Sequence, residues 1–194
     1  LRPRMLHALF DVGNAGLAGQ RLDRVDRVVD VEWWSPAWVA VVDADYVVDP
    51  AWLRQLGGWF AFDDVGAVQA PQAHRDWQQR DALARMMNWE YEGFFRIGMH
   101  HRHERNAVIQ HGTMTVVRAS ALRDVGHAGR EGGRARREGG DIRGGWNTAC
   151  ICEDTELGLR LLERGMRVLY VDRVLGTGLV PHDFDAYARQ RRRW

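Results

Sequence analysis

The sequence contains no lysine, and all 27 residues counted as lysine or arginine are arginines. This absence excludes Schiff-base and other lysine-dependent chemistry within the 194 residues. The only two cysteines, Cys150 and Cys152, are too close in sequence for an ordinary disulfide and too few for a zinc site. The net charge of +1 argues against a protein that binds polyanions over its whole surface.

Long apolar runs are also missing, since none approaches the roughly 20 residues that a membrane-spanning helix needs. A hydrophobic content of 45% and a charged content of 27% are ordinary for a globular domain. We therefore expect a single domain over residues 1–194, which is long enough to bury a substantial core. The chain begins at Leu1 and stops at Trp194 inside a basic helical pattern, so we expect a truncated piece of a longer protein.

Apolar segments typical of strands alternate with patterns of helical spacing along the chain. Strands are expected at residues 38–42, 65–70, 107–118 (as two strands around a tight polar loop) and 167–171, and helices at 50–60, 76–96, 119–125, 153–164 and from Asp183 onward. This alternation predicts an α/β fold with a mostly parallel sheet flanked by helices.

Two polar segments are expected to lie at the surface. His100, His101 and His103 lack helical i, i+4 spacing and predict a solvated loop more simply than a metal site. Residues 127–145 are rich in glycine and arginine and predict a surface loop or insertion. Binding of a phosphate or nucleic-acid backbone is the alternative for that loop, although no aromatic residues are interleaved.

Asp43 and Asp45 follow directly after the apolar run at 38–42, which predicts a strand buried on both faces. The carboxyl end of such a strand is where ligands bind in open α/β sheets. In an extended chain residues i and i+2 point the same way, so the two carboxylates are expected to converge on one divalent cation. On these residues alone, a polar turn that ends the strand is the simpler interpretation.

Two later motifs have ordinary structural explanations when each is taken alone. Glu153-Asp154 opens a helical pattern, where acidic residues are favoured by the helix dipole. Gln190-Arg191-Arg192-Arg193-Trp194 ends the chain, where arginines commonly form a solvated face and a terminal tryptophan packs or frays.

Taken in order, Asp43-Ala44-Asp45, Glu153-Asp154 and Gln190-Arg191-Arg192-Arg193-Trp194 resemble the motifs of the processive family 2 glycosyltransferases, the cellulose-synthase-like group. Val68-Gln69-Ala70-Pro71-Gln72 is similar to the Val-Gln-Thr-Pro stretch of that family. The resemblance covers about residues 38–194. It implies a GT-A-like, Rossmann-related fold whose N-terminal strands are partly missing.

The resemblance implies inverting transfer of a sugar from a nucleotide sugar, with UDP-sugar expected, to a growing glycan. It assigns Asp154 as the general base that takes the proton of the acceptor hydroxyl. It places Mg²⁺ or Mn²⁺ at Asp45, with Asp43 nearer the nucleotide. Arg193 is expected to hold the diphosphate together with Asp43.

The acceptor side implied by the resemblance comprises Trp194, Gln190, Glu153, His111 and Gly112. Trp194 offers an indole face to a sugar ring, and Gly112 permits close approach of the backbone to a ligand. The expected partners are the nucleotide-sugar donor, the glycan acceptor and membrane segments of the parent protein, with no nucleic acid. The parent is expected in the plasma membrane, with this domain facing the cytoplasm.

The sequence also departs from the family pattern. Cys152 stands where the family has threonine, the upstream base-recognising aspartate is not identifiable, and the family's lysine-containing stretch has no lysine here. Two alternatives therefore stay open. One is a degenerate module that binds sugar or nucleotide without turnover. The other is a binder of anionic surfaces or nucleic acid through residues 127–145.

Overall fold

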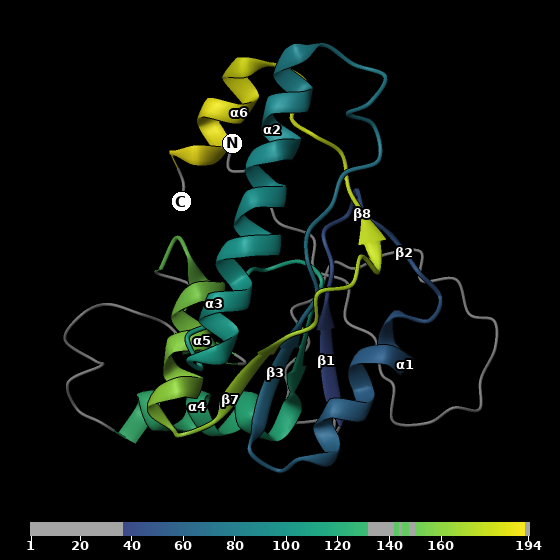
Figure 1. The fold of residues 1–194 in the computed structure, drawn as a ribbon. Coiled ribbons are helices and arrows are strands. Elements are labelled where there is room, and N and C mark those ends of the chain that lie inside the picture. Colours follow the sequence, from purple (N-terminus) through teal and green to yellow (C-terminus); the bar gives the residue numbers. More distant parts are fainter. Residues whose placement is uncertain (1–36, 132–141, 144, 148–149, 193–194) are drawn as a thin grey trace, which may run out of the picture.

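A four-stranded sheet forms the centre of the computed structural model, which describes residues 37–131, 142–143, 145–147 and 150–192. The strand order is β1-β4-β3-β7. These strands are β1 (Trp38–Val41), β4 (Thr115–Arg118), β3 (Val65–Gln69) and β7 (Arg167–Tyr170). β4 pairs antiparallel with both β1 and β3, whereas β3 pairs parallel with β7. Three of the four strands therefore run in one direction (Figure 1).

The remaining elements surround this sheet. The helical segments are α1 (Trp52–Gly57), η2 (Gly58–Ala61), α2 (Ala82–Gly93), η3 (Phe94–Gly98), α3 (Met99–Glu104), α4 (Ala119–Glu131), α5 (Glu153–Glu163) and α6 (Phe184–Arg191). Two short antiparallel pairs join β2 (Val47–Val48) to β8 (Gly176–Thr177) and β5 (Ile142–Arg143) to β6 (Trp146–Asn147). In Figure 1, α6 lies beside α2, away from the α4 and α5 end of the domain.

Each face of the sheet has its own apolar core, because successive strand residues point to opposite faces. Val39 and Val41 belong to the core shared with α2, η3, α3, α4 and α5. Ala40 and Val42 belong to the core shared with α1 and η2. The strand predicted at 38–42 is thus buried on both faces, and the predicted α/β architecture with a helix-flanked sheet is confirmed.

The prediction of a strand just before the polar loop at 111–114 is wrong. Residues 107–110 form no strand, and the last of them, Gln110, lies against α5. The side chain of Gln110 is 1% exposed, and its backbone carbonyl accepts a hydrogen bond from Thr155 Oγ1 at 3.2 Å. Gly158 of α5 lies directly against Gln110, so helix and loop approach closely.

The predicted loop around the histidine cluster is also wrong, because these residues form α3. α2 starts after Asp81, whose side chain accepts a hydrogen bond from the amide of Ala84 at 2.9 Å, and helical structure continues through the π-helical η3. His100 contacts Asp172 at 2.8 Å, and Nδ1 of His103 accepts from the amide of Tyr170 at 3.2 Å. Two of the histidines therefore fasten α3 to β7 and the segment after it.

Part of the loop predicted over residues 127–145 is regular structure instead. α4 continues to Glu131, and β5 pairs with β6. Residues 132–141 and 144 lie outside the described residues. By contrast, the helix start predicted at Asp183 is confirmed, since its carboxylate accepts a hydrogen bond from the amide of Ala186 at 2.7 Å.

Two leucines of α5 provide a matched test of which face of this helix is buried. Leu161 is 0% exposed, whereas Leu159 is 57% exposed. We expect Leu161→Ala to lower the free energy of unfolding by about 2–5 kcal/mol through lost burial and a cavity. Leu159→Ala is expected to change it by less than about 0.5 kcal/mol. Urea unfolding followed by circular dichroism measures both, and equal losses would contradict this packing.

Candidate functional site

The candidate residues gather at one edge of the sheet. β1, β3 and β7 end at this edge, and β4, which runs the opposite way, begins there. The segment that contains Asp43 and Asp45 follows β1, and the loop at 111–114 leads into β4. The carboxyl ends of parallel strands are the usual ligand-binding edge of such sheets.

Asp43 and Asp45 lie in a tight turn, not in extended chain. The amide of Tyr46 donates to the carbonyl of Asp43 at 3.0 Å, which closes the turn. The sequence predicts that the two carboxylates converge because residues i and i+2 of an extended chain point the same way. That reason does not apply to residues in a turn. Thr113 Oγ1 accepts a hydrogen bond from the amide of Asp43 at 2.9 Å. One carboxylate oxygen of Asp45 accepts from the amide of Leu179 at 2.9 Å.

Arg75 and Tyr46 support the same turn from two sides. The Arg75 guanidinium donates to the backbone carbonyl of Asp45 at 2.8 Å and also to the carbonyl of Thr177. The Tyr46 ring packs against Gly178 so closely that a side chain there would overlap it. Burial raises the pKa of Tyr46, and nearby anionic groups including Asp45 raise it further, so the phenol stays protonated.

The donor set at this turn suits a hard cation only if a ligand completes it. Among the described residues, no group of three or more His, Cys, Asp or Glu side chains is arranged to hold a metal ion. Asp43 and Asp45 provide two carboxylates, and Mg²⁺ sites commonly combine one or two carboxylates with substrate phosphates and water. The two residues therefore fit a cation that arrives with a phosphorylated ligand.

Asp154 lies half-buried in the first turn of α5, one residue after the half-buried Glu153. Its Oδ1 accepts a hydrogen bond from the amide of Thr155 at 2.7 Å. Its Oδ2 lies 3.4 Å from the position that a Cβ would occupy on Gly112. The structure thus brings together two residues, Asp154 and Gly112, that the sequence placed in one site. The missing side chain at Gly112 leaves the space beside the carboxylate open.

His111 is held in place by its backbone and enclosed by two phenylalanines. Its amide donates to Gln69 Oε1 at 2.8 Å, and its ring centroid lies 5.1 Å from that of Phe94 and 5.3 Å from that of Phe95. Burial lowers the pKa of His111 to about 4, despite the opposing effect of the Asp154 carboxylate. The imidazole is therefore neutral near pH 7. Its Nε2 is buried and has no hydrogen-bond partner among the described residues.

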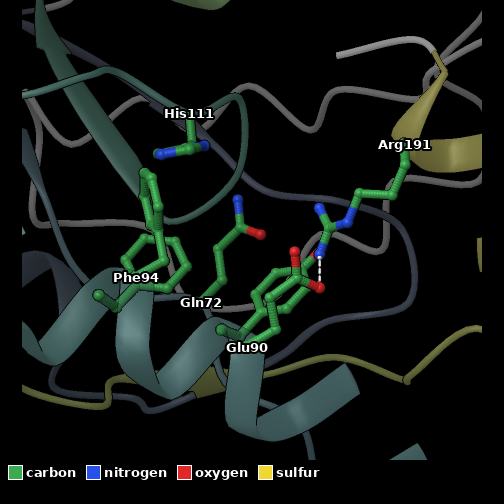
Figure 2. Close-up of a pocket in the computed structure, with 7 residues that line it drawn as sticks. Gln72, Glu90, Phe94, His111 and Arg191 are labelled. Atoms are coloured by element: carbon green, nitrogen blue, oxygen red, sulfur yellow. Dashed lines mark hydrogen bonds and ion pairs between the residues drawn. The ribbon is translucent and has the colours of Figure 1, made fainter. Parts of the chain in front are cut away.

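A pocket of about 100 Å³ opens beside His111 (Figure 2). Its lining consists of Gln72, Glu90, Tyr91, Phe94, Phe95, His111 and Arg191. Figure 2 shows His111 and Phe94 on one side and the Glu90–Arg191 pair on the other, with Gln72 between them. Aromatic walls with a few polar groups are typical of small-ligand sites, and of sugar sites in particular.

Of the seven lining residues, His111 was predicted as a site residue and the other six were not. Tyr91 and Phe94 lie at helical spacing within the helix predicted at 76–96, and this pattern predicts core residues. Arg191 belongs to a run of arginines that predicts a solvated face. Tyr91 is indeed buried at 6% exposure, but one edge of it also lines the pocket. Glu90 belongs to the same pattern by its spacing, and its charge gave no indication of a distant partner. For Arg191 the sequence does contain a signal. Arg191 stands four residues after Tyr187, and this spacing places both side chains on one face of the last helix.

The structure places only part of the predicted C-terminal motif. Gln190 lies on α6, where its Oε1 is buried and has no hydrogen-bond partner among the described residues. Arg193 and Trp194 lie outside the described residues. Within the described part of the chain, none of the helices has the length and apolar character to cross a membrane.

Two comparisons with known proteins bear on this site. The model of a family described as "Glycosyl transferase family group 2" matches residues 38–194. The chain is also similar to the UDP-forming cellulose synthase catalytic subunit of Xanthomonas axonopodis pv. citri (strain 306), with 26% identity over 165 residues. That match covers 82% of this chain and 20% of the relative, so the chain spans about a fifth of the relative's length.

The low pKa of His111 predicts a pH dependence of stability. An unfolded histidine titrates near 6.5, whereas the folded one titrates at about 4, so the unfolded chain takes up the proton first as the pH falls. This residue's contribution is complete above pH 6.5 and is lost toward pH 4. We expect it to account for about 2 kcal/mol of the loss of unfolding free energy between pH 7 and 5. Urea unfolding at both pH values measures that loss.

The variant His111→Gln isolates the imidazole, because glutamine does not titrate in this range. It is expected to show a smaller loss between pH 7 and 5 than the wild type, by about 2 kcal/mol. Equal losses in the two proteins would show that the imidazole is not held neutral by burial.

Proposed function

The chain belongs to glycosyl transferase family group 2, and we propose that it transfers a sugar from a nucleotide-sugar donor to a glycan acceptor with inversion at the anomeric carbon. The observation that carries this proposal is the placement of Asp154 Oδ2 beside Gly112, at 3.4 Å from its Cβ position. A carboxylate facing an open space at the ligand-binding edge of the sheet suits a general base. A UDP-sugar is the proposed donor, supported by the similarity to a UDP-forming enzyme.

In this proposal the turn at Asp43 and Asp45 receives the diphosphate of the donor. Members of this family generally use divalent cations, and Mg²⁺ or Mn²⁺ would be held by Asp45 and Asp43 together with the donor phosphates. The cation, when bound, supplies positive charge that stabilises the departing diphosphate. Thr113, Leu179 and Arg75 fix the turn through hydrogen bonds to its backbone and to the Asp45 carboxylate. Arg193 is proposed as a further contact to the phosphates.

The acceptor is proposed to approach from the pocket side of Asp154. Asp154 takes the proton of the attacking hydroxyl, and the absence of a side chain at Gly112 admits that hydroxyl next to Oδ2. The neutral His111 offers a hydrogen-bonding Nε2 at the pocket wall without adding charge. Gln190, Glu153 and Trp194 are proposed to contact the acceptor. The membrane association of the parent protein is likewise proposed, from the similarity to a cellulose synthase subunit.

Removing the proposed base tests the transfer reaction directly. Asp154→Asn keeps the size of the side chain but removes its basicity, so we expect kcat to fall by about 10²–10⁴-fold with little change in the KM for the donor. UDP release and label transfer from a panel of UDP-sugars, with Mg²⁺ or Mn²⁺ present, measure the rate.

The matched control is Glu163→Gln, which alters an exposed carboxylate on the same helix and is expected to retain wild-type activity. Activity of Asp154→Asn within threefold of the wild type would rule out Asp154 as the base. A wild-type protein that binds a UDP-sugar but shows no turnover would instead identify a degenerate binding module.

The role of Asp45 predicts a changed metal requirement. Asp45→Asn retains an oxygen that accepts from the amide of Leu179 but removes the negative charge. We expect the concentration of Mn²⁺ or Mg²⁺ that gives half-maximal activity to rise at least about tenfold. Asp49→Asn is the control, because Asp49 also accepts a hydrogen bond from a backbone amide, that of Ala51 at 2.7 Å. If the two variants have the same metal dependence as the wild type, Asp45 is not a ligand.

A further inference from the structure

The last helix, α6, is only eight residues long, and none of its residues is buried. Helices of this length are marginal in water unless tertiary contacts hold them. Its N-terminal end is fixed, because Arg80 donates to the backbone carbonyl of His182 at 2.6 Å and Asp183 caps the first turn. Toward its C-terminal end, the contacts that the structure describes with α2 are made by side chains.

Those contacts form one cluster between α6 and α2. Glu90 of α2 accepts a hydrogen bond from Tyr187 Oη at 2.7 Å and from the Arg191 guanidinium at 2.6 Å, and the latter is also an ion pair. The guanidinium lies over two aromatic rings, 5.1 Å from the centroid of Tyr91 and 5.0 Å from that of Tyr187. A planar cation held by a carboxylate and two ring faces has a well-defined orientation.

The cluster also borders the pocket beside His111. Arg191 and Glu90 line it on one side, and His111 lines it on the other (Figure 2). His111 is followed by Gly112, and a Cβ on that glycine would lie 3.4 Å from Asp154 Oδ2. Gln190, with its buried side-chain oxygen, immediately precedes Arg191 on α6. A shift of the end of α6 would thus move both a pocket wall and Gln190.

We infer that Arg191 is a positioning residue, and that with Glu90 it forms a latch that fastens α6 to α2 and so sets the acceptor side of the pocket. This inference rests on the proposed transfer reaction. Arg191 does not contact the reacting atoms in this proposal. The latch acts instead on the geometry in which the acceptor meets Asp154. Misplacement of a substrate-positioning element lowers the rate of the chemical step even when ligand binding persists.

The test combines kinetics with hydrogen exchange of the full chain. Arg191→Met retains an apolar side chain of similar length but loses the ion pair. We expect kcat to fall at least tenfold, with the KM for the UDP-sugar changed less than threefold. Amides of α6 should exchange at least tenfold faster, whereas those around Leu157 and Leu161 in α5 should exchange at the wild-type rate. Arg191→Lys, which retains the charge, should restore part of kcat.

Two further variants make the result specific to the latch. Glu90→Gln should reproduce the Arg191→Met effects, and the double variant should be no worse than either single one, because both break the same contact. Arg189→Met alters an exposed arginine of the same helix and should match the wild type. Glu90→Gln also provides the test if Arg191→Met fails to fold.

Each outcome discriminates between the two proposals. If Arg191→Met transfers sugar at a rate within twofold of the wild type, the latch has no positioning role and the proposed function stands. If kcat falls but the exchange of α6 is unchanged, Arg191 acts on the substrate itself and the latch is wrong. If the wild type transfers no sugar from any donor, the proposed function fails, and exchange of α6 still reports whether the latch exists.

Discussion

The loop at residues 111–114 depends on one buried glutamine, and the candidate site depends on that loop. Gln69, the last residue of β3, is 0% exposed, and its Oε1 accepts from the amide of His111 at 2.8 Å and from Thr115 Oγ1 at 3.3 Å. An acceptor buried without donors costs about 1–3 kcal/mol, so these bonds strongly favour a single loop conformation. A strand residue that points inward thereby fixes a loop that would otherwise be free to vary.

The fixed loop joins the two halves of the proposed chemistry. Thr113 holds the amide of Asp43 at 2.9 Å, and Gly112 lies against the Asp154 carboxylate. The proposed donor side and the proposed base are therefore connected through neighbouring residues of one loop. This arrangement requires β4 to run antiparallel between β1 and β3, because only a strand that begins at the carboxyl edge brings its preceding loop there.

The sequence predicts features that are encoded locally and misses those that depend on distant partners. The strand before Asp43 and the polar turn after it were both predictable from local residues. The hydrogen bonds that tie this turn to Thr113 and Leu179 were not, because those partners are distant in sequence. The Glu90–Arg191 contact joins residues 101 positions apart, and no periodicity links them. The false strand at 107–110 has the same origin: Gln110 lies against α5, a helix more than 40 residues later in the sequence.

The neutral state of His111 follows from its position and has a consequence for the neighbouring carboxylate. A protonated imidazole beside Asp154 would pair with it and lower its basicity, which would oppose its proposed role. The enclosure by Phe94 and Phe95 makes the charged imidazole costly, and this effect outweighs the attraction of the carboxylate. The phenylalanines of η3 thus disfavour a positive charge on His111, next to the proposed base.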